Sequence, residues 1–110
     1  MAPMKNVLFI CGKNRRRSPT AEQIFAEDAR LEVASAGTSA DADNPLTSEL
    51  VEWADVIFVM EQEHRRKLVA GFRASLKKAR VVCLDIPDRY AFMAPELIEL
   101  LKSRVVAHLR

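Results

Sequence analysis

The chain has 110 residues, of which 49% are hydrophobic and 29% charged, the balance of an ordinary globular protein. Its formal net charge of +2 is too small to indicate a nucleic-acid-binding protein, and no apolar run is long enough to span a membrane. Residues 1–5 lead straight into an apolar run, so we expect no signal peptide. The two cysteines lie far apart without metal-ligand spacing, which favours a reducing cytoplasm and no bound metal.

Apolar runs alternate with helical patterns along the chain. Strands are expected at residues 6–11, 31–36, 55–60 and 80–84, and helices at residue 18 to about 29, from 44–45 to 54, at 61–72 and from 95 onward. The pairs Ser18-Pro19 and Asn44-Pro45 each place a capping side chain before a proline, which is a helix-start signal. Strands that are apolar throughout, alternating with helices, predict one doubly wound α/β domain over residues 1–110, with a parallel four-stranded sheet between two helical layers.

The segment between the first strand and the first helix has the pattern of a phosphate-binding loop. Cys11 ends the strand, and Arg17 stands beside the helix start. Loop N–H groups and a helix N-terminus attract an anion, and the same surroundings favour the nucleophilic thiolate of a cysteine. The Arg17 guanidinium can bind two oxygens of a phosphoryl group. A structural cysteine buried at a strand end is the alternative interpretation of Cys11.

The same residues carry a resemblance to a known family. Cys11, five further residues, Arg17 and Ser18, after a hydrophobic strand and before Pro-Thr-Ala-Glu, resemble the low-molecular-weight protein tyrosine phosphatases. Ser-Ala-Gly-Thr at residues 35–38 and the run over residues 53–65 continue this resemblance. It implies strand order 2-1-3-4 and hydrolysis through a cysteinyl phosphate, without cofactor or metal. The loop residues expected to bind substrate are Gly12, Lys13, Asn14, Arg15, Arg16 and Ser18.

Two of these loop residues have more specific expected roles. Asn14 is expected to adopt a left-handed turn conformation, which asparagine tolerates better than most residues, and so to hold the shape of the loop. Ser18 is expected to hydrogen-bond to the Cys11 sulfur and help it leave.

A general acid is needed for the leaving oxygen. By the resemblance, Asp88 in the segment Ile86-Pro87-Asp88-Arg89-Tyr90 is the general acid, and Tyr90 is an aromatic wall of the substrate pocket. Asp85, directly at the end of the fourth strand, competes for the acid role. Instead of acting as the acid, either carboxylate could cap a turn of the loop. Instead of lining the pocket, Tyr90 could simply pack in the protein interior.

The chain departs from the family at several positions. The segment between the second and third strands is reduced to residues 38–53. Lys13 stands where the family has glycine and would need a conformation that glycine adopts more easily, while Arg16 replaces a second loop cysteine. Arg15 and Arg16 suggest a ligand more anionic than a phosphotyrosine ring, or else two solvated side chains at the rim. Cys83 is expected to be a buried strand residue, which counts against the related arsenate reductases with their further cysteines.

The sequence therefore predicts a phosphatase that acts on phosphomonoesters, most of all on phosphotyrosine in protein, and releases inorganic phosphate. Its partner would be a phosphorylated protein or a small phosphomonoester. The alternative is an inactive phosphate-binding module that recognises phosphorylated protein or nucleotide. Nucleic-acid binding through residues 15–17 would require stacking aromatics and a steep salt dependence, and the chain offers few such aromatics. We expect no membrane partner.

Overall fold

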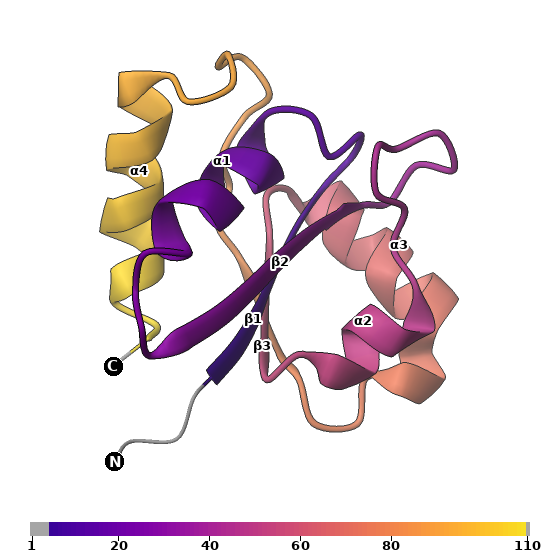
Figure 1. Cartoon of the computed structure of the whole chain (residues 1–110). Helices are drawn as coiled ribbons and strands as arrows, with labels where there is room; N and C mark the ends of the chain where they lie inside the picture. Colours follow the sequence, from indigo (N-terminus) through magenta and orange to yellow (C-terminus); the bar gives the residue numbers. More distant parts are fainter. Residues whose placement is uncertain (1–4, 110) are drawn as a thin grey trace.

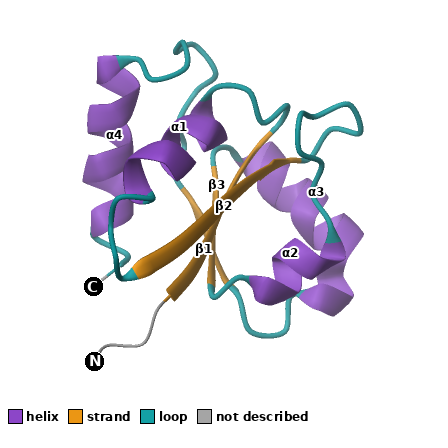
Figure 2. Ribbon diagram, in the orientation of Figure 1, coloured by secondary structure: helices purple, strands orange, loops and turns teal. Residues whose placement is uncertain are grey.

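The computed structural model describes residues 5–109 as four parallel strands between two pairs of helices. The elements are β1 (Lys5–Cys11), α1 (Arg17–Phe25), β2 (Leu31–Gly37), α2 (Ser48–Trp53), β3 (Val56–Val59), α3 (Gln62–Phe72) with a 3₁₀ turn (Arg73–Ser75), β4 (Arg80–Cys83) and α4 (Pro95–Val106). The strand order is β2-β1-β3-β4, so the predicted fold class and order are confirmed. Helices α1 and α4 cover one face of the sheet, and α2 and α3 cover the other (Figures 1 and 2).

The central strand β1 supplies both halves of the core because successive side chains of a strand point to opposite faces. Val7, Phe9 and Cys11 lie on the face that packs against α1 and α4. Leu8 and Ile10 face α2 and α3. All five are buried, and burial of each large aliphatic or aromatic side chain contributes about 1.5–3 kcal/mol. A strand buried on both faces has little freedom to move, so the loop that follows Cys11 starts from a fixed point.

The final helix is placed as the sequence predicts. It begins at Pro95, and its Leu97, Leu101 and Val105 are completely buried against the β1 face that carries Phe9. Within residues 5–109 no helix combines the length and the hydrophobicity needed to cross a bilayer.

The predicted start and end of the first helix are wrong. Helix α1 runs from Arg17 to Phe25, with Arg16 at its N-cap position, instead of from Ser18 to about Ala29. Ser18 does not cap the helix because its hydroxyl is engaged by Cys11 and Asn14.

The predicted start of the second helix is also wrong. Thr47 caps α2 by accepting a hydrogen bond from the backbone N–H of Leu50. The Asn44 side chain instead donates to the carbonyl of Ser35 at 2.7 Å, and Pro45 pairs with Gly37 at the end of β2. These two residues thus fasten the loop after β2 to the sheet.

The connections leave β1 and β3 on opposite sides of the sheet. The chain passes from β1 through α1 to β2 on one face, and from β3 through α3 to β4 on the other (Figure 1). In such sheets ligands bind beyond the carboxyl ends of the strands, where neighbouring connections diverge. The loop after Cys11 and the residues after Val59 meet at this point.

Candidate active site

The loop after β1 is held from outside by the segment that follows β2. Three backbone N–H groups of this segment donate to three consecutive loop carbonyls: Thr38 to Cys11 (2.9 Å), Ser39 to Gly12 (2.9 Å) and Asp43 to Lys13 (3.1 Å). In a trans peptide the carbonyl and the following N–H point in opposite directions. The amides of residues 12, 13 and 14 therefore face the Cys11 side of the loop, and the Asn14 N–H donates to Cys11 Sγ at 3.2 Å.

Asn14 makes the turn that closes the loop. Its φ of 57° lies in the left-handed region, as the sequence predicts for this residue. Lys13 has no positive φ, so the expectation that it would need a glycine-like conformation is wrong: the turn is made one residue later. Asn14 is buried, and its side-chain amide donates to Ser18 Oγ at 2.8 Å. Ser18 Oγ in turn lies 2.9 Å from Cys11 Sγ.

Arg17 is held by groups that follow β3 and β4. Its side chain is only 4% exposed, and its Nη1 donates to Glu61 Oε2 and to the carbonyl of Ile86, both at 2.6 Å. Glu61 is itself held as the N-cap of α3. The loops after β3 and β4 thus set the orientation of the guanidinium that the first helix carries.

Glu61 and its neighbour His64 were not predicted as site residues from the sequence. His64 is buried, and its Nδ1 accepts a hydrogen bond from the backbone N–H of Glu61 at 3.2 Å, so the other ring nitrogen, Nε2, carries the proton of the neutral ring. A Cβ at Gly12 would lie 3.7 Å from that Nε2. Burial lowers the pKa of His64, and the nearby Arg17 charge lowers it further. An acidic residue directly after the third strand was the available signal, because parallel strands end at the same edge of the sheet.

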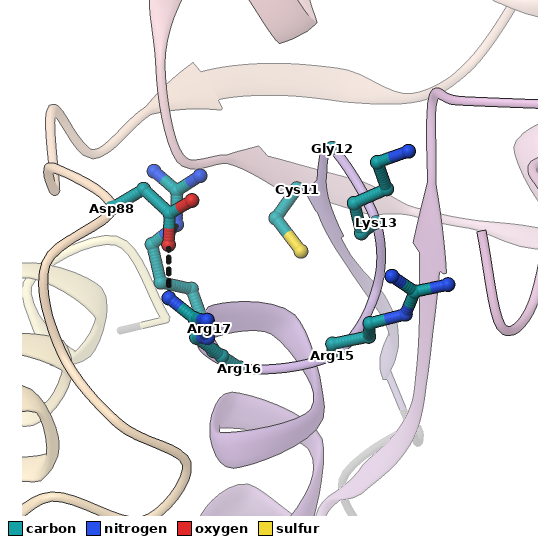
Figure 3. A pocket seen from close by; sticks show the side chains of 7 residues that line it. All are labelled: Cys11, Gly12, Lys13, Arg15, Arg16, Arg17 and Asp88. Carbon is teal, nitrogen blue, oxygen red and sulfur yellow. Dashed lines mark ion pairs between the residues drawn. The ribbon is translucent and has the colours of Figure 1, made fainter. Parts of the chain in front are cut away.

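A cavity of about 170 Å³ opens above the Cys11 sulfur (Figure 3). Its lining combines the nucleophile candidate, four cationic side chains and one carboxylate: Cys11, Gly12, Lys13, Arg15, Arg16, Arg17 and Asp88. This excess of positive charge suits a phosphomonoester dianion.

Asp88 lies across the cavity mouth from the loop. Its Oδ1 is 3.8 Å from Arg17 Nε and 3.9 Å from Arg16 Nη1, and its side chain is exposed (Figure 3). Asp85 is not among the residues of the described chain that line the cavity. It has a φ of 54°, and its carboxylate accepts a hydrogen bond from the Cys83 thiol at 3.3 Å.

Tyr90 is not among the residues within the range 5–109 that line the cavity. It is half-buried, and it packs against the apolar cluster under α1 and α4. The Arg89 guanidinium lies 5.5 Å from the centre of its ring. These contacts fit the packing alternative for Tyr90, and its role as an aromatic wall of the substrate pocket stays a prediction.

Two cations at the rim are paired with the segment after β2. Lys13 Nζ lies 2.6 and 2.7 Å from the two carboxylate oxygens of Asp41, and Arg15 Nε lies 3.1 Å from Asp43 Oδ1. The Lys13 and Ser39 hydrogen bonds lower the pKa of Asp41 to about 2. The shortened segment therefore still supports the loop, with both backbone and side-chain contacts.

Residues 6–52 match the family model of low molecular weight phosphotyrosine protein phosphatase. The predicted resemblance to this family is confirmed. The matched residues include the whole loop from Cys11 to Ser18, whereas Glu61 and Asp88 lie outside them. No curated protein sequence matches the chain.

Solved structures share the fold over nearly the whole chain. Wzb of Vibrio vulnificus in complex with benzylphosphonate is 25% identical with a TM-score of 0.75, covering 96% of this chain and 97% of that chain. A low molecular weight phosphotyrosine phosphatase of Vibrio cholerae O395 is 20% identical with a TM-score of 0.76, at 96% and 94% coverage. The YwlE arginine phosphatase of Geobacillus stearothermophilus is 23% identical with a TM-score of 0.71, at 96% and 92% coverage.

Proposed function

We propose that this protein hydrolyses phosphomonoesters, with protein phosphotyrosine as substrate, through a cysteinyl phosphate at Cys11. The observation that carries this proposal is the position of Cys11 Sγ, which lies at the cavity between the Asn14 N–H (3.2 Å) and Ser18 Oγ (2.9 Å). Both groups can donate to a Cys11 thiolate, and such hydrogen bonds stabilise its negative charge. The benzylphosphonate bound by the Vibrio vulnificus relative carries an aromatic group, which supports an aryl phosphate.

The phosphoryl group would be bound by the loop amides and by Arg17. The N–H groups of residues 12–14 face the cavity side of the loop. Arg17 Nε and Nη2 make no hydrogen bond within residues 5–109, so they can bind the substrate. Because Glu61 and Ile86 fix the guanidinium before substrate arrives, little reorganisation is needed in the transition state. The same groups hold phosphorus in line with the sulfur.

The reaction would proceed in two steps. In the first, the Cys11 thiolate attacks phosphorus, the S–P bond forms, the P–O bond to the leaving group breaks, and Asp88 gives its proton to the leaving oxygen. In the second, the Asp88 carboxylate takes a proton from water, whose oxygen attacks phosphorus. The S–P bond then breaks, and inorganic phosphate and the Cys11 thiolate are released. Asp88 lies on the far side of the cavity mouth, where a leaving group would be.

The proposed location of this chemistry is the cytoplasm. Cys11 and Cys83 are both free thiols, and a catalytic thiolate needs a reducing environment.

The test compares Cys11→Ser with Cys83→Ser, which removes the other thiol. Cys11→Ser should abolish turnover of p-nitrophenyl phosphate and retain inorganic phosphate binding in calorimetry, while Cys83→Ser should retain both. Persisting turnover in Cys11→Ser would exclude the mechanism. If the unmodified protein binds phosphate and hydrolyses no aryl phosphate, the chain is the phosphate-binding module instead.

A further inference from the structure

The cations at the cavity mouth differ in how fully they are paired. Lys13 Nζ contacts both oxygens of Asp41, and Arg15 donates to Asp43 Oδ1 and, at 3.3 Å, to the carbonyl of Asp41. The Arg16 guanidinium makes no hydrogen bond to any residue within the range 5–109, and it is 59% exposed. Its nearest carboxylate oxygen there is Asp88 Oδ1 at 3.9 Å, beyond hydrogen-bond distance. Arg16 is therefore the least neutralised cation at the mouth.

The carboxylate nearest to Arg16, that of Asp88, is shared with Arg17 and loses its negative charge in the proposed first step. Asp88 lies equally close to Arg17, with Oδ1 at 3.8 Å from Arg17 Nε. In the proposed first step Asp88 carries a proton and has no charge. Arg16 then has no counter-charge within 4 Å among the described residues, at the moment when the substrate fills the cavity beside it.

We propose that Arg16 is a specificity-determining residue, which binds the carboxylate of an acidic residue adjacent to the phosphotyrosine of a protein substrate. This inference rests on the proposed function. A guanidinium presents a planar set of donors that matches a carboxylate. The part of the cavity wall that is described contains no aromatic side chain, so charge and not stacking is available to select the substrate there.

The experiment measures kcat/KM for three peptides that differ in the residue next to phosphotyrosine: glutamate, its uncharged isostere glutamine, or lysine. For the unmodified protein we expect the glutamate peptide to exceed the glutamine peptide by about threefold to fivefold, and the lysine peptide to be lowest. Because both charges are exposed, the ratio should fall toward one as salt is raised. Arg16→Gln should bring the ratio close to one at low salt, and Arg16→Lys should restore part of it.

Arg66→Gln is the matched control. Arg66 is exposed on α3, and its replacement removes the same charge and should leave the peptide ratio unchanged. A disturbance of Asp88 by Arg16→Gln would slow all three peptides alike and would not change their ratio. The ratio therefore reports recognition of the neighbouring residue alone.

The peptide experiment distinguishes failure of the Arg16 inference from failure of the proposed function. Equal hydrolysis of the three peptides by the unmodified protein would overturn this inference and leave the proposed function intact. Hydrolysis of none of them would overturn the proposed function itself. The assignment to Arg16 would be overturned if Arg16→Gln kept the kcat/KM ratio of the glutamate peptide to the glutamine peptide. It would also be overturned if Arg15→Gln lost that ratio instead.

Discussion

Ser18 Oγ lies 2.9 Å from Cys11 Sγ and also accepts a hydrogen bond from the Asn14 side-chain amide at 2.8 Å. Because Asn14 supplies a proton to one lone pair of the hydroxyl oxygen, the hydroxyl proton itself is available to the sulfur. A Cys11 thiolate has no proton to give, so Ser18 is the donor when the sulfur is negatively charged, as it is when it leaves phosphorus.

Ser18→Ala should slow the breakdown of the cysteinyl phosphate more than its formation. A hydrogen bond to a charged group contributes about 1.5–3 kcal/mol, which corresponds to about 10- to 100-fold in rate. Rapid-quench kinetics with p-nitrophenyl phosphate should show a larger burst of nitrophenolate followed by slower turnover. Ser103→Ala, at an exposed position of α4, is the control and should behave as the unmodified protein. A Ser18→Ala variant without a burst, or with full turnover, would contradict this role.

Asp88→Asn should lower kcat/KM, and the loss should grow as the leaving group becomes a poorer one. General acid catalysis contributes about 10²- to 10⁴-fold, and a nitrophenolate needs it less than a tyrosine phenolate does. The measurement is kcat/KM, which reports formation of the cysteinyl phosphate, for a series of aryl phosphates of graded leaving-group basicity.

Asp85→Asn provides the comparison for that series, since Asp85 bonds to the Cys83 thiol and lies outside the cavity lining. The rate of the Asp85→Asn variant should depend on leaving-group basicity in the same way as the rate of the unmodified protein. If Asp85→Asn acquires the steeper dependence and Asp88→Asn does not, the assignment of the acid is reversed.

Gly37→Ala should destabilise the fold and weaken phosphate binding together. A Cβ at Gly37 would lie 2.5 Å from Ala42 Cβ and 2.5 Å from the Gly12 carbonyl oxygen, so the phosphate loop would have to move. Overpacking of this kind costs about 1–3 kcal/mol. Urea unfolding gives the free energy of unfolding, and calorimetry gives the affinity for phosphate.

Gly71→Ala is the matched glycine control. Gly71 lies within α3, and a Cβ there would meet nothing within 4 Å. Alanine should raise the free energy of unfolding by about 0.5–1 kcal/mol, because glycine loses more backbone entropy in a helix. Phosphate affinity should not change. Equal effects of the two substitutions would show that the close approach at Gly37 does not support the loop.

His64 should make the folded protein less stable as the pH falls below about 6.5, the ordinary pKa of a histidine. In the folded protein, burial lowers the pKa of the His64 imidazole most, and the positive charge of Arg17 lowers it further. The negative charges of Glu61 and Glu63 raise this pKa by smaller amounts. The unfolded chain thus binds the proton more tightly, and acidification favours unfolding until the folded-state pKa is reached, by at most about 1.4 kcal/mol per pH unit.

The measurement is the free energy of unfolding between pH 5 and pH 7. In His64→Gln the amide oxygen can still accept a hydrogen bond from the Glu61 N–H, and no imidazole titrates. Its stability should vary less with pH over this window than that of the unmodified protein. An identical pH dependence in the two proteins would show that His64 titrates alike in the folded and unfolded states.

The alternation of strands and helices and the nucleophile loop could be predicted from the sequence. Residues 7–10 are apolar in succession, which is typical of a strand covered on both faces, and such runs alternate with helical patterns along the chain. The loop from Cys11 to Ser18 is contiguous, so its pattern was visible directly. The left-handed turn at Asn14 could be predicted because asparagine is one of the few residues that tolerate it.

The distant groups that meet this loop could not be predicted from the sequence and are evident from the packing of the strands. Glu61 follows β3 and Asp88 follows β4, and both reach Arg17 because parallel strands bring their carboxyl ends to one edge of the sheet. Helix starts were mispredicted at Ser18 and Asn44, since Ser18 Oγ contacts Cys11 Sγ and the Asn44 amide donates to the Ser35 carbonyl instead of capping a helix. Local pattern fixes what a segment can form, whereas the partner of each polar side chain depends on the packing of segments far apart in the chain.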